Sequence, residues 1–281
     1  MRALLIVFLG LVACGGSGDP VASPAAVEAF DSDQPDVVLL SVSGRNLDLL
    51  NFFCPPECNQ PYLGAPDRAG GVLKTELEFN GYSVERRNYI AALLSYDDND
   101  DGEPDRLGCL KLIQDLRWIH ENWIEGQASP TRIVLVGHSH GCVWSHNVVS
   151  ALPEIPIEVL ISLDGVSTQW ESDHVPSIED YYDSEGGNPF PVDLRDVTSV
   201  WSGRDTKDVV FDNVAFNVEV RSENDCTVCL FDDVDNTRLN GSFAGIASIE
   251  ADGEDHSEVT NEGSDGMLFV IDQLLTRLAL P

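Results

Sequence analysis

The stretch that decides the fold is Thr131-Arg-Ile-Val-Leu-Val-Gly-His-Ser139-His-Gly-Cys-Val-Trp144. Its apolar, β-branched start predicts a buried strand over 131–136, and a helix is expected over 140–152. Between them, Gly137-His-Ser139-His-Gly141 fits the pattern G-x-S-x-G, in which the small residues let strand and helix cross closely. This context predicts that Ser139 is a nucleophile on a sharp turn. The helix N-terminus would help to stabilise developing negative charge.

Strands and helices alternate on both sides of this stretch. Alternation of this kind predicts right-handed crossovers and a doubly wound parallel sheet. The segment 167–196 is polar and acidic with scattered aromatic residues, and we expect it to form a cap over a site. The other expected strands are 36–43, 82–88, 157–163, 197–201, 216–220 and 245–251, and the other expected helices are 70–80, 106–125 and 267–278.

From about Asp36 to its end, the chain resembles the α/β-hydrolase family, and more narrowly the small bacterial lipases and esterases. The resemblance implies a three-layer α/β fold, with a mainly parallel sheet flanked by helices and no cofactor for catalysis. It also implies the chain order serine, acid, histidine. His256 follows the last expected strand, where the family has its catalytic histidine, and His174 in the cap segment is the rival.

The acid of the triad has three candidates. Asp225 follows an expected strand and precedes His256 by a separation typical of the family, so it ranks first. Asp164 ends Leu160-Ile-Ser-Leu-Asp164, a position where some related esterases carry their acid. Asp205 follows the expected strand 197–201 and ranks third.

Two backbone N–H groups are needed to stabilise the oxyanion of an acyl transfer. The resemblance places one at His140 and the other at Arg45, in Ser43-Gly44-Arg45. The expected activity is hydrolysis of a small ester or lipid substrate through an acyl-enzyme. The alternative is a surface binding or adhesion lipoprotein that uses the same scaffold.

A second motif lies apart from these residues. The segment 97–105 fits D-x-N-x-D-G-x-x-D, which places oxygen ligands at alternate positions around a glycine turn. It resembles the short calcium loops of thrombospondin type 3 repeats and dockerins, although the twelfth position is Gly108 instead of the EF-hand glutamate. We expect a weak structural Ca²⁺ site or a solvated acidic loop, with the candidate ligands Asp97, Asn99, Asp101 and Asp105.

The N-terminus has the pattern of an export signal. An apolar run after Arg2 ends in Leu11-Val-Ala-Cys14, which resembles the lipobox of bacterial lipoproteins. We therefore expect a signal peptide over 1–13, lipidation of Cys14, a flexible tether over 14–35 and a hydrolase domain over 36–281. The expected location is the bacterial cell envelope, with membrane contact through the lipid anchor alone.

Six further cysteines suggest disulfides in an exported chain. Local loops between Cys54 and Cys58 and between Cys226 and Cys229 would leave Cys109 to pair with Cys142, although other pairings stay open. A zinc site built from the two short-spaced pairs is the less favoured alternative.

The charge of the chain is far from balanced. Its 281 residues include 48 acidic and 16 basic side chains, for a net charge of −32. Such a surface repels nucleic acid and anionic lipid headgroups. We therefore expect no nucleic-acid partner and a monomeric protein.

Overall fold

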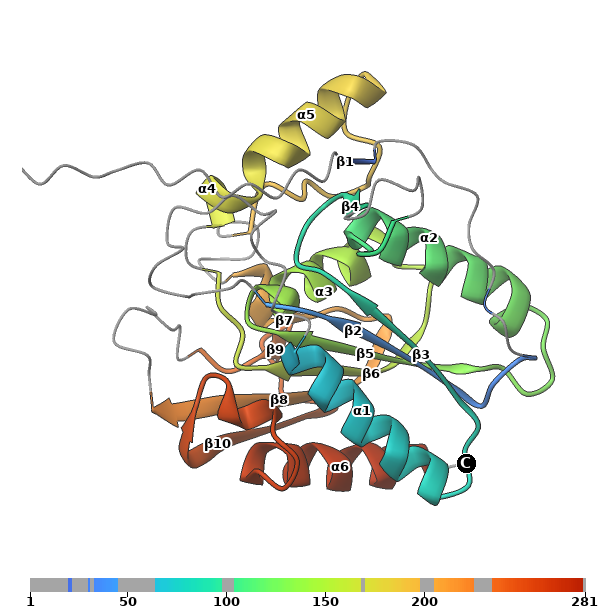
Figure 1. The fold of residues 1–281 in the computed structure, drawn as a ribbon, viewed down its shortest axis with the longest axis vertical. Helices are drawn as coiled ribbons and strands as arrows, with labels where there is room; N and C mark the ends of the chain where they lie inside the picture. The colour runs from blue at the N-terminus through green and yellow to red at the C-terminus, as the bar shows by residue number, and fades with distance from the viewer. Residues whose placement is uncertain are drawn as a thin grey trace, which may run out of the picture.

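Six parallel strands form the central sheet, in the spatial order β10-β8-β6-β5-β2-β3 (Figure 1). A computed structural model describes residues 20–21, 30, 33–44, 64–97, 104–167, 170–197, 205–224 and 234–279. The chain order reverses between β2 and β5, because β3 lies on one side of β2 and all later strands lie on the other. The strands are β2 (Val37–Val42), β3 (Val84–Tyr89), β5 (Arg132–His138), β6 (Ile157–Leu163), β8 (Val214–Asn224) and β10 (Ile246–Asp255).

The central strands are buried on both faces, which explains their nearly continuous apolar sequence. All six residues of β2 are buried. Side chains alternate between faces with period two, so Val38 and Leu40 join one core and Val37 and Leu39 join the other.

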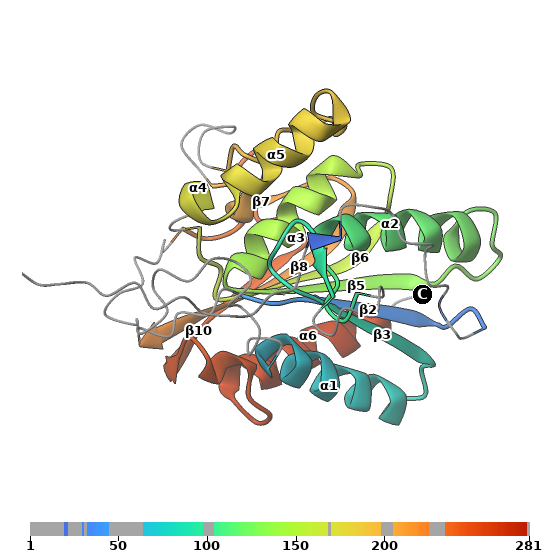
Figure 2. The same cartoon turned by 45° about the horizontal axis from the view of Figure 1, so that its top comes forward.

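Helices cover each face of the sheet (Figure 2). Residues of α1 (Gly64–Phe79) and α6 (Asp265–Leu278) pack in the core on one face. Residues of α2 (Cys109–Ile119) and α3 (His140–Ala151) pack in the core on the other face. Two further helices, α4 (Trp170–Asp173) and α5 (Val175–Glu185), lie on the α3 side and form part of the segment expected to be a cap.

Short elements complete the described chain. The strand β1 (Pro20–Val21) pairs antiparallel with β4 (Ser95–Tyr96), and β7 (Val209–Val210) pairs parallel with β9 (Thr237–Arg238). A π-helical turn (His120–Ile124) extends α2, and 3₁₀ turns cover Thr206–Asp208 and Glu258–Thr260.

The predicted fold class is confirmed: the protein has a mainly parallel sheet between two helical layers, with a strand–turn–helix at Ser139. The helix expected over 106–125 begins later, at Cys109. The residues before it are already bonded elsewhere, because Arg106 pairs with Tyr96 and the Leu107 carbonyl accepts from the Ile90 N–H. Most of the strand expected over 197–201 lies outside the described residues.

The proposed pairing of Cys109 with Cys142 is wrong, because both thiols are free and buried. The Cys109 thiol donates to the carbonyl of Ile90, just after β3, whereas the Cys142 thiol donates to the carbonyl of Leu163, at the end of β6. Two strands separate β3 from β6. These carbonyls are therefore about 14 Å apart at ordinary strand spacing, which is far beyond the reach of a disulfide.

Several expected features lie outside the described residues: the signal segment, Cys14, Arg45, Asn99, Asp101, Asp225 and the cysteines at 54, 58, 226 and 229. At the ends of the acidic loop, Asp97 and Asp105 are described, and the adjacent Tyr96–Arg106 bridge closes the loop at its base. The calcium site stays a prediction. Within the described part of the chain, no helix is both long and apolar enough to cross a bilayer.

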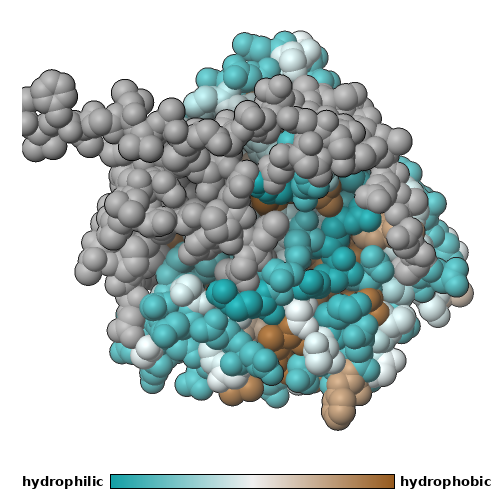
Figure 3. All heavy atoms as spheres, viewed as in Figure 1, coloured by the Kyte–Doolittle hydropathy of each residue, from teal (hydrophilic) through white to brown (hydrophobic). Residues whose placement is uncertain are grey.

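The face in Figure 3 is mostly hydrophilic over the described atoms, with small separate apolar areas. This distribution is consistent with the large excess of acidic over basic residues in the sequence.

Candidate active site

Ser139 occupies the sharp turn between β5 and α3 that the sequence predicted. Its backbone has φ 57° and ψ −127°, a strained conformation for a residue with a side chain. The Ser139 carbonyl accepts from the Cys142 N–H at 3.0 Å to begin α3, and the Ser139 N–H donates to the Leu163 carbonyl at 3.1 Å. The turn is thus fixed by the neighbouring strand as well as by its own helix.

Glycines let three backbones meet at this turn. A Cβ on Gly141 would lie 2.3 Å from the Val42 carbonyl oxygen, so α3 can approach the end of β2 only without a side chain there. A Cβ on Gly44, in the loop after β2, would lie 2.5 Å from the Ser139 Cβ. The loop that leads to Arg45 therefore reaches the nucleophile at the switch point of the sheet, where α/β proteins bind ligands.

His256 and Asp164 form a buried pair at the same edge of the sheet. The His256 Nδ1 donates to Asp164 Oδ2 over 2.5 Å, and both side chains are almost fully buried. Asp164 follows β6 directly and His256 follows β10, so the two residues come from the carboxyl ends of different parallel strands. Of the two acid candidates that the structure describes, Asp164 and Asp205, Asp164 is therefore the one that lies against His256.

The carboxylate of Asp164 is held by more than His256. The Ser222 N–H donates to Oδ1 at 2.9 Å, and the Ser222 hydroxyl donates to Oδ2 at 2.8 Å. Burial alone would raise the pKa of Asp164, but the hydrogen bonds from His256 and Ser222 outweigh burial and lower that pKa. Asp164 is therefore a fixed anion that can orient an imidazole. Ser222 was not among the predicted site residues, and no motif marks it.

His138 supports His256 from the other side. Its Nε2 donates to the His256 carbonyl at 2.7 Å, and the two rings lie 4.6 Å apart. Burial, and then the proximity of His256, hold the pKa of His138 well below its usual value, so this ring stays neutral. His138 precedes Ser139 in the chain, so these contacts hold His256 against the residue next to the nucleophile.

The Ser139 hydroxyl is buried and makes no hydrogen bond to any described residue. A proton transfer from Ser139 to His256 therefore requires a side-chain movement that closes the gap between them. Catalytic hydrogen bonds are often long without substrate and shorten in the reacting complex.

The other candidate base, His174, and the third candidate acid, Asp205, make different contacts. The rival base His174 lies against His140, with 3.1 Å between their nitrogens. A further histidine, His146 of α3, was not a candidate; it donates to the Val209 carbonyl and accepts from Ser162, so it is part of the core. Asp205 caps a 3₁₀ turn and accepts from the Ser167 hydroxyl.

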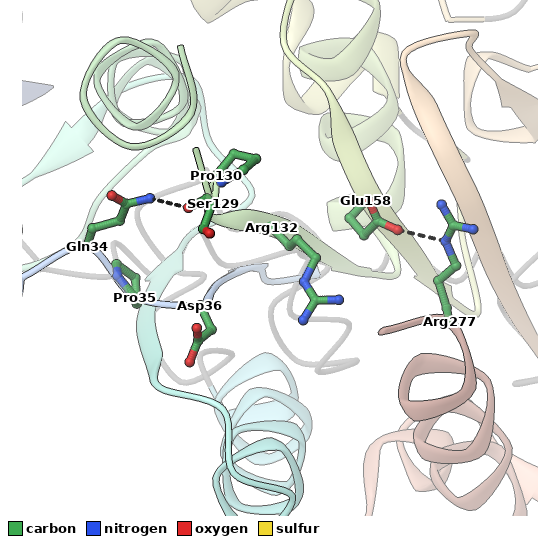
Figure 4. Close-up of a pocket in the computed structure, with 8 residues that line it drawn as sticks. All are labelled: Gln34, Pro35, Asp36, Ser129, Pro130, Arg132, Glu158 and Arg277. Atoms are coloured by element: carbon green, nitrogen blue, oxygen red, sulfur yellow. Dashed lines mark hydrogen bonds and ion pairs between the residues drawn. The ribbon is translucent and has the colours of Figure 1, made fainter. Parts of the chain in front are cut away.

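A pocket of about 720 Å³ lies at the opposite edge of the sheet (Figure 4). Asp36 precedes β2, Arg132 begins β5 and Glu158 lies at the start of β6, so this pocket is at the amino ends of the strands. In the close-up, an ion pair joins Arg277 to Glu158 across it. It therefore takes no part in the arrangement around Ser139.

No protein-family model matches the sequence, and no curated protein matches it. Solved structures with similar folds include Est1E from Butyrivibrio proteoclasticus, at 12% identity and a TM-score of 0.42 over 89% of this chain and 91% of that one. An alpha-beta serine hydrolase homologue from Coxiella burnetii is 15% identical, with a TM-score of 0.39 over 89% and 88% of the chains.

A structure from a study of LipS and LipT, two metagenome-derived lipolytic enzymes, is 10% identical, with a TM-score of 0.44 over 88% of this chain and 95% of that one. All three structures have TM-scores below 0.5. At these scores they add nothing on substrate. The assignment of the α/β-hydrolase fold rests on the sheet order and the turn at Ser139.

Proposed function

We propose that this protein is a serine hydrolase of carboxylic esters, with Ser139 as nucleophile, His256 as general base and Asp164 as the acid that orients it. One observation carries the proposal. A serine on a strained strand-to-helix turn lies at the same sheet edge as a buried histidine–aspartate pair. Ser139 follows β5, Asp164 follows β6 and His256 follows β10, so the chain order is serine, acid, histidine.

Each residue has one step in the proposed reaction. Ser139 Oγ attacks the ester carbonyl carbon while its proton passes to His256 Nε2. Asp164 stabilises the resulting imidazolium through the bond to Nδ1. His256 then gives the proton to the departing alcohol oxygen, and the acyl group stays on Ser139. Water, activated by His256, hydrolyses this acyl-enzyme and restores the hydroxyl.

The oxyanion of each tetrahedral intermediate would be held by backbone N–H groups. His140 is the first residue of α3, and N–H groups at that end of a helix point away from the helix body. Arg45, the second proposed donor, follows Gly44, which contacts Ser139. The donors would thus come from the loops after β5 and β2.

Asp164 takes precedence over Asp225 in this proposal. Its carboxylate already bonds His256 Nδ1 and receives two hydrogen bonds from Ser222. An acid at that place fixes the tautomer that leaves Nε2 available to accept the serine proton. Asp225 lies outside the described residues.

The test is hydrolysis of a series of p-nitrophenyl esters, together with covalent labelling by a fluorophosphonate. We expect Ser139→Ala to lose both, with a loss of turnover of roughly 10⁶-fold, the scale reported for removal of a catalytic serine. Ser150→Ala is the matched control, because Ser150 lies in the helix that follows Ser139 and donates to the Asn147 carbonyl.

A folded wild-type protein that neither hydrolyses the esters nor takes the label would overturn the proposal. That result would favour the alternative, a surface binding lipoprotein on a hydrolase scaffold.

A further inference from the structure

Three side chains with metal-binding atoms meet where the segment after β6 contacts the first turn of α3. They are His140, Asp173 and His174, and their ligand atoms all lie within 4.8 Å of one another. His140 Nδ1 lies 3.1 Å from His174 Nε2 and 4.0 Å from Asp173 Oδ2. The three residues come from the start of α3, the end of α4 and the residue that precedes α5.

The donor atoms and their spacing suit a first-row transition ion. Two imidazole nitrogens and a carboxylate oxygen form a common ligand set for Zn²⁺. Two nitrogens on a tetrahedral zinc are about 3.4 Å apart, given Zn–N bonds of about 2.0–2.1 Å. The observed 3.1 Å between His140 Nδ1 and His174 Nε2 is close to this value. A small rotation of the Asp173 side chain would bring its oxygen to a similar separation.

The surroundings hold the two rings in place. His140 and His174 are 2% and 1% exposed. The indoles of Trp144 and Trp170 pack on His174, with ring centroids 5.2 and 4.4 Å away, and the His174 N–H donates to the Trp170 carbonyl. A metal site gains from such an apolar shell, which limits water and fixes the ligand orientation.

Asp173 distinguishes this arrangement from a simple pair of histidines. Two neutral imidazoles satisfy each other through one N–H···N hydrogen bond and need no third group. The carboxylate next to them adds a negative charge that a divalent cation would balance in a low-dielectric place. Asp173 keeps 14% of its side chain exposed, which gives an ion a route to the site.

We propose that His140, Asp173 and His174 bind a zinc-class divalent ion that ties α4 and α5 to the nucleophile turn. The ion would join α3, the helix that follows Ser139, to the helices of the expected cap. It would stabilise their packing and take no part in the ester chemistry.

The experiment measures zinc binding in the full chain that carries Ser139→Ala, so that ester hydrolysis plays no part in the readout. After removal of metal with a chelator, equilibrium dialysis against Zn²⁺ should give one bound ion at this site. His174→Gln and Asp173→Asn should each weaken binding at least about tenfold, and His120→Gln, on the π-helical turn, should not. Zn²⁺ should raise the melting temperature of the parent and leave that of His174→Gln unchanged.

Cobalt supplies a second readout of the same site. Co²⁺ in a site with two nitrogens and an oxygen at low coordination number should give visible absorption bands, and these should vanish in Asp173→Asn. Asp173 is partly exposed, so this variant tests the ligand without disturbing the core.

Two results would overturn the proposal. The first is a parent protein that binds no zinc. The second is zinc binding of equal affinity in the parent and in His174→Gln, which would place the ion elsewhere in the chain. Either result would leave the two histidines as a hydrogen-bonded pair, and neither would bear on the role of Ser139.

Discussion

Among the described residues, only Ser139 and Asp164 adopt a positive φ without being glycine, at 57° and 49°. Such conformations cost free energy and persist where the surroundings impose them. The two residues end neighbouring strands, and the Ser139 N–H is bonded to the residue that precedes Asp164. The strain is therefore concentrated on the proposed nucleophile and the proposed acid.

The acid can be tested by a substitution that preserves its shape. Asp164→Asn should lower turnover by roughly 10⁴-fold, the effect of the same change in a serine protease. Asparagine tolerates positive φ, so the backbone should hold and the circular dichroism spectrum should not change. Turnover of p-nitrophenyl acetate is the measurement.

Asp225→Asn and Asp205→Asn are the comparison variants, and both should retain most activity. Full activity in Asp164→Asn with collapse in Asp225→Asn would return the role to Asp225, the acid that sequence position ranked first.

Glu219 should make the stability of the folded protein depend on pH. Glu219 is buried in β8 and accepts from the Asn236 N–H, and burial raises its pKa from 4.5 to about 7. Between these values the folded state binds more protons than the unfolded state, so stability should fall as pH rises through this window. The loss is about 3 kcal/mol at most.

Glu219→Gln should remove this loss of stability, because a glutamine side chain does not titrate. Its amide oxygen can still accept from the Asn236 N–H. Melting curves at pH 4 and pH 8 are the measurement. The variant should melt higher than wild type at pH 8 and show little or no such gain at pH 4. Equal shifts at both pH values would show that the titration of Glu219 does not carry the effect.

At the scale of elements, sequence patterns predicted most of the sheet because the strands are buried on both faces and have nearly continuous apolar sequences. The pairing of distant elements was not predictable in the same way. Asp164 meets Ser222 because β6 and β8 pair in register, with Leu163 opposite Val220. Neither Asp164 nor Ser222 lies in a motif, so Asp225 ranked first on the expected strand before it and on its distance from His256 along the chain.

The cysteine pairing failed for the same reason. Cys109 and Cys142 were paired by elimination, but their positions are set by the spatial order of β3 and β6. The spacing of residues along the sequence does not reveal the order of the strands in the sheet. The turn at Ser139 was predictable because its strand, its glycines and its helix lie within one short stretch of chain.

The close crossing of α3 and β2 yields a prediction about glycine. Gly141→Ala should destabilise the protein by about 1–3 kcal/mol or more, because its Cβ would meet the carbonyl oxygens of Val42 and Ser43 at 2.3 and 2.5 Å. Activity should fall with it, since the turn must shift. Denaturant unfolding and ester turnover measure the two effects.

Gly71→Ala is the control, because its Cβ would meet only the end of the Arg86 side chain at 3.5 Å. It should leave stability unchanged or raise it by about 0.5–1 kcal/mol, since alanine favours the helix. Equal losses in the two variants would show that the crossing at Gly141 is not unusually close.

At the scale of the whole molecule, the sheet places both proposed sites at its carboxyl edge. Ser139, Asp164 and His256 follow β5, β6 and β10, and His140 begins the helix that follows Ser139. The pocket with Arg132 and Arg277 lies at the amino ends of the strands. In a parallel sheet all carboxyl ends of the strands share one edge, where ligands bind. The alternation of strands and helices in the sequence indicates a sheet of this kind.

The net charge of −32 bears on how the protein would reach a membrane. Anionic headgroups repel an acidic surface, so attachment would depend on acyl chains at Cys14, where several chains give firm binding. Cys14→Ser should therefore move the protein from the membrane fraction to the soluble fraction after cell lysis, as measured by immunoblot. Ser17→Ala, three residues along the expected tether, should stay with the membrane, as should wild type after a high-salt wash. A Cys14→Ser protein that sediments as fully as wild type would contradict the lipid anchor.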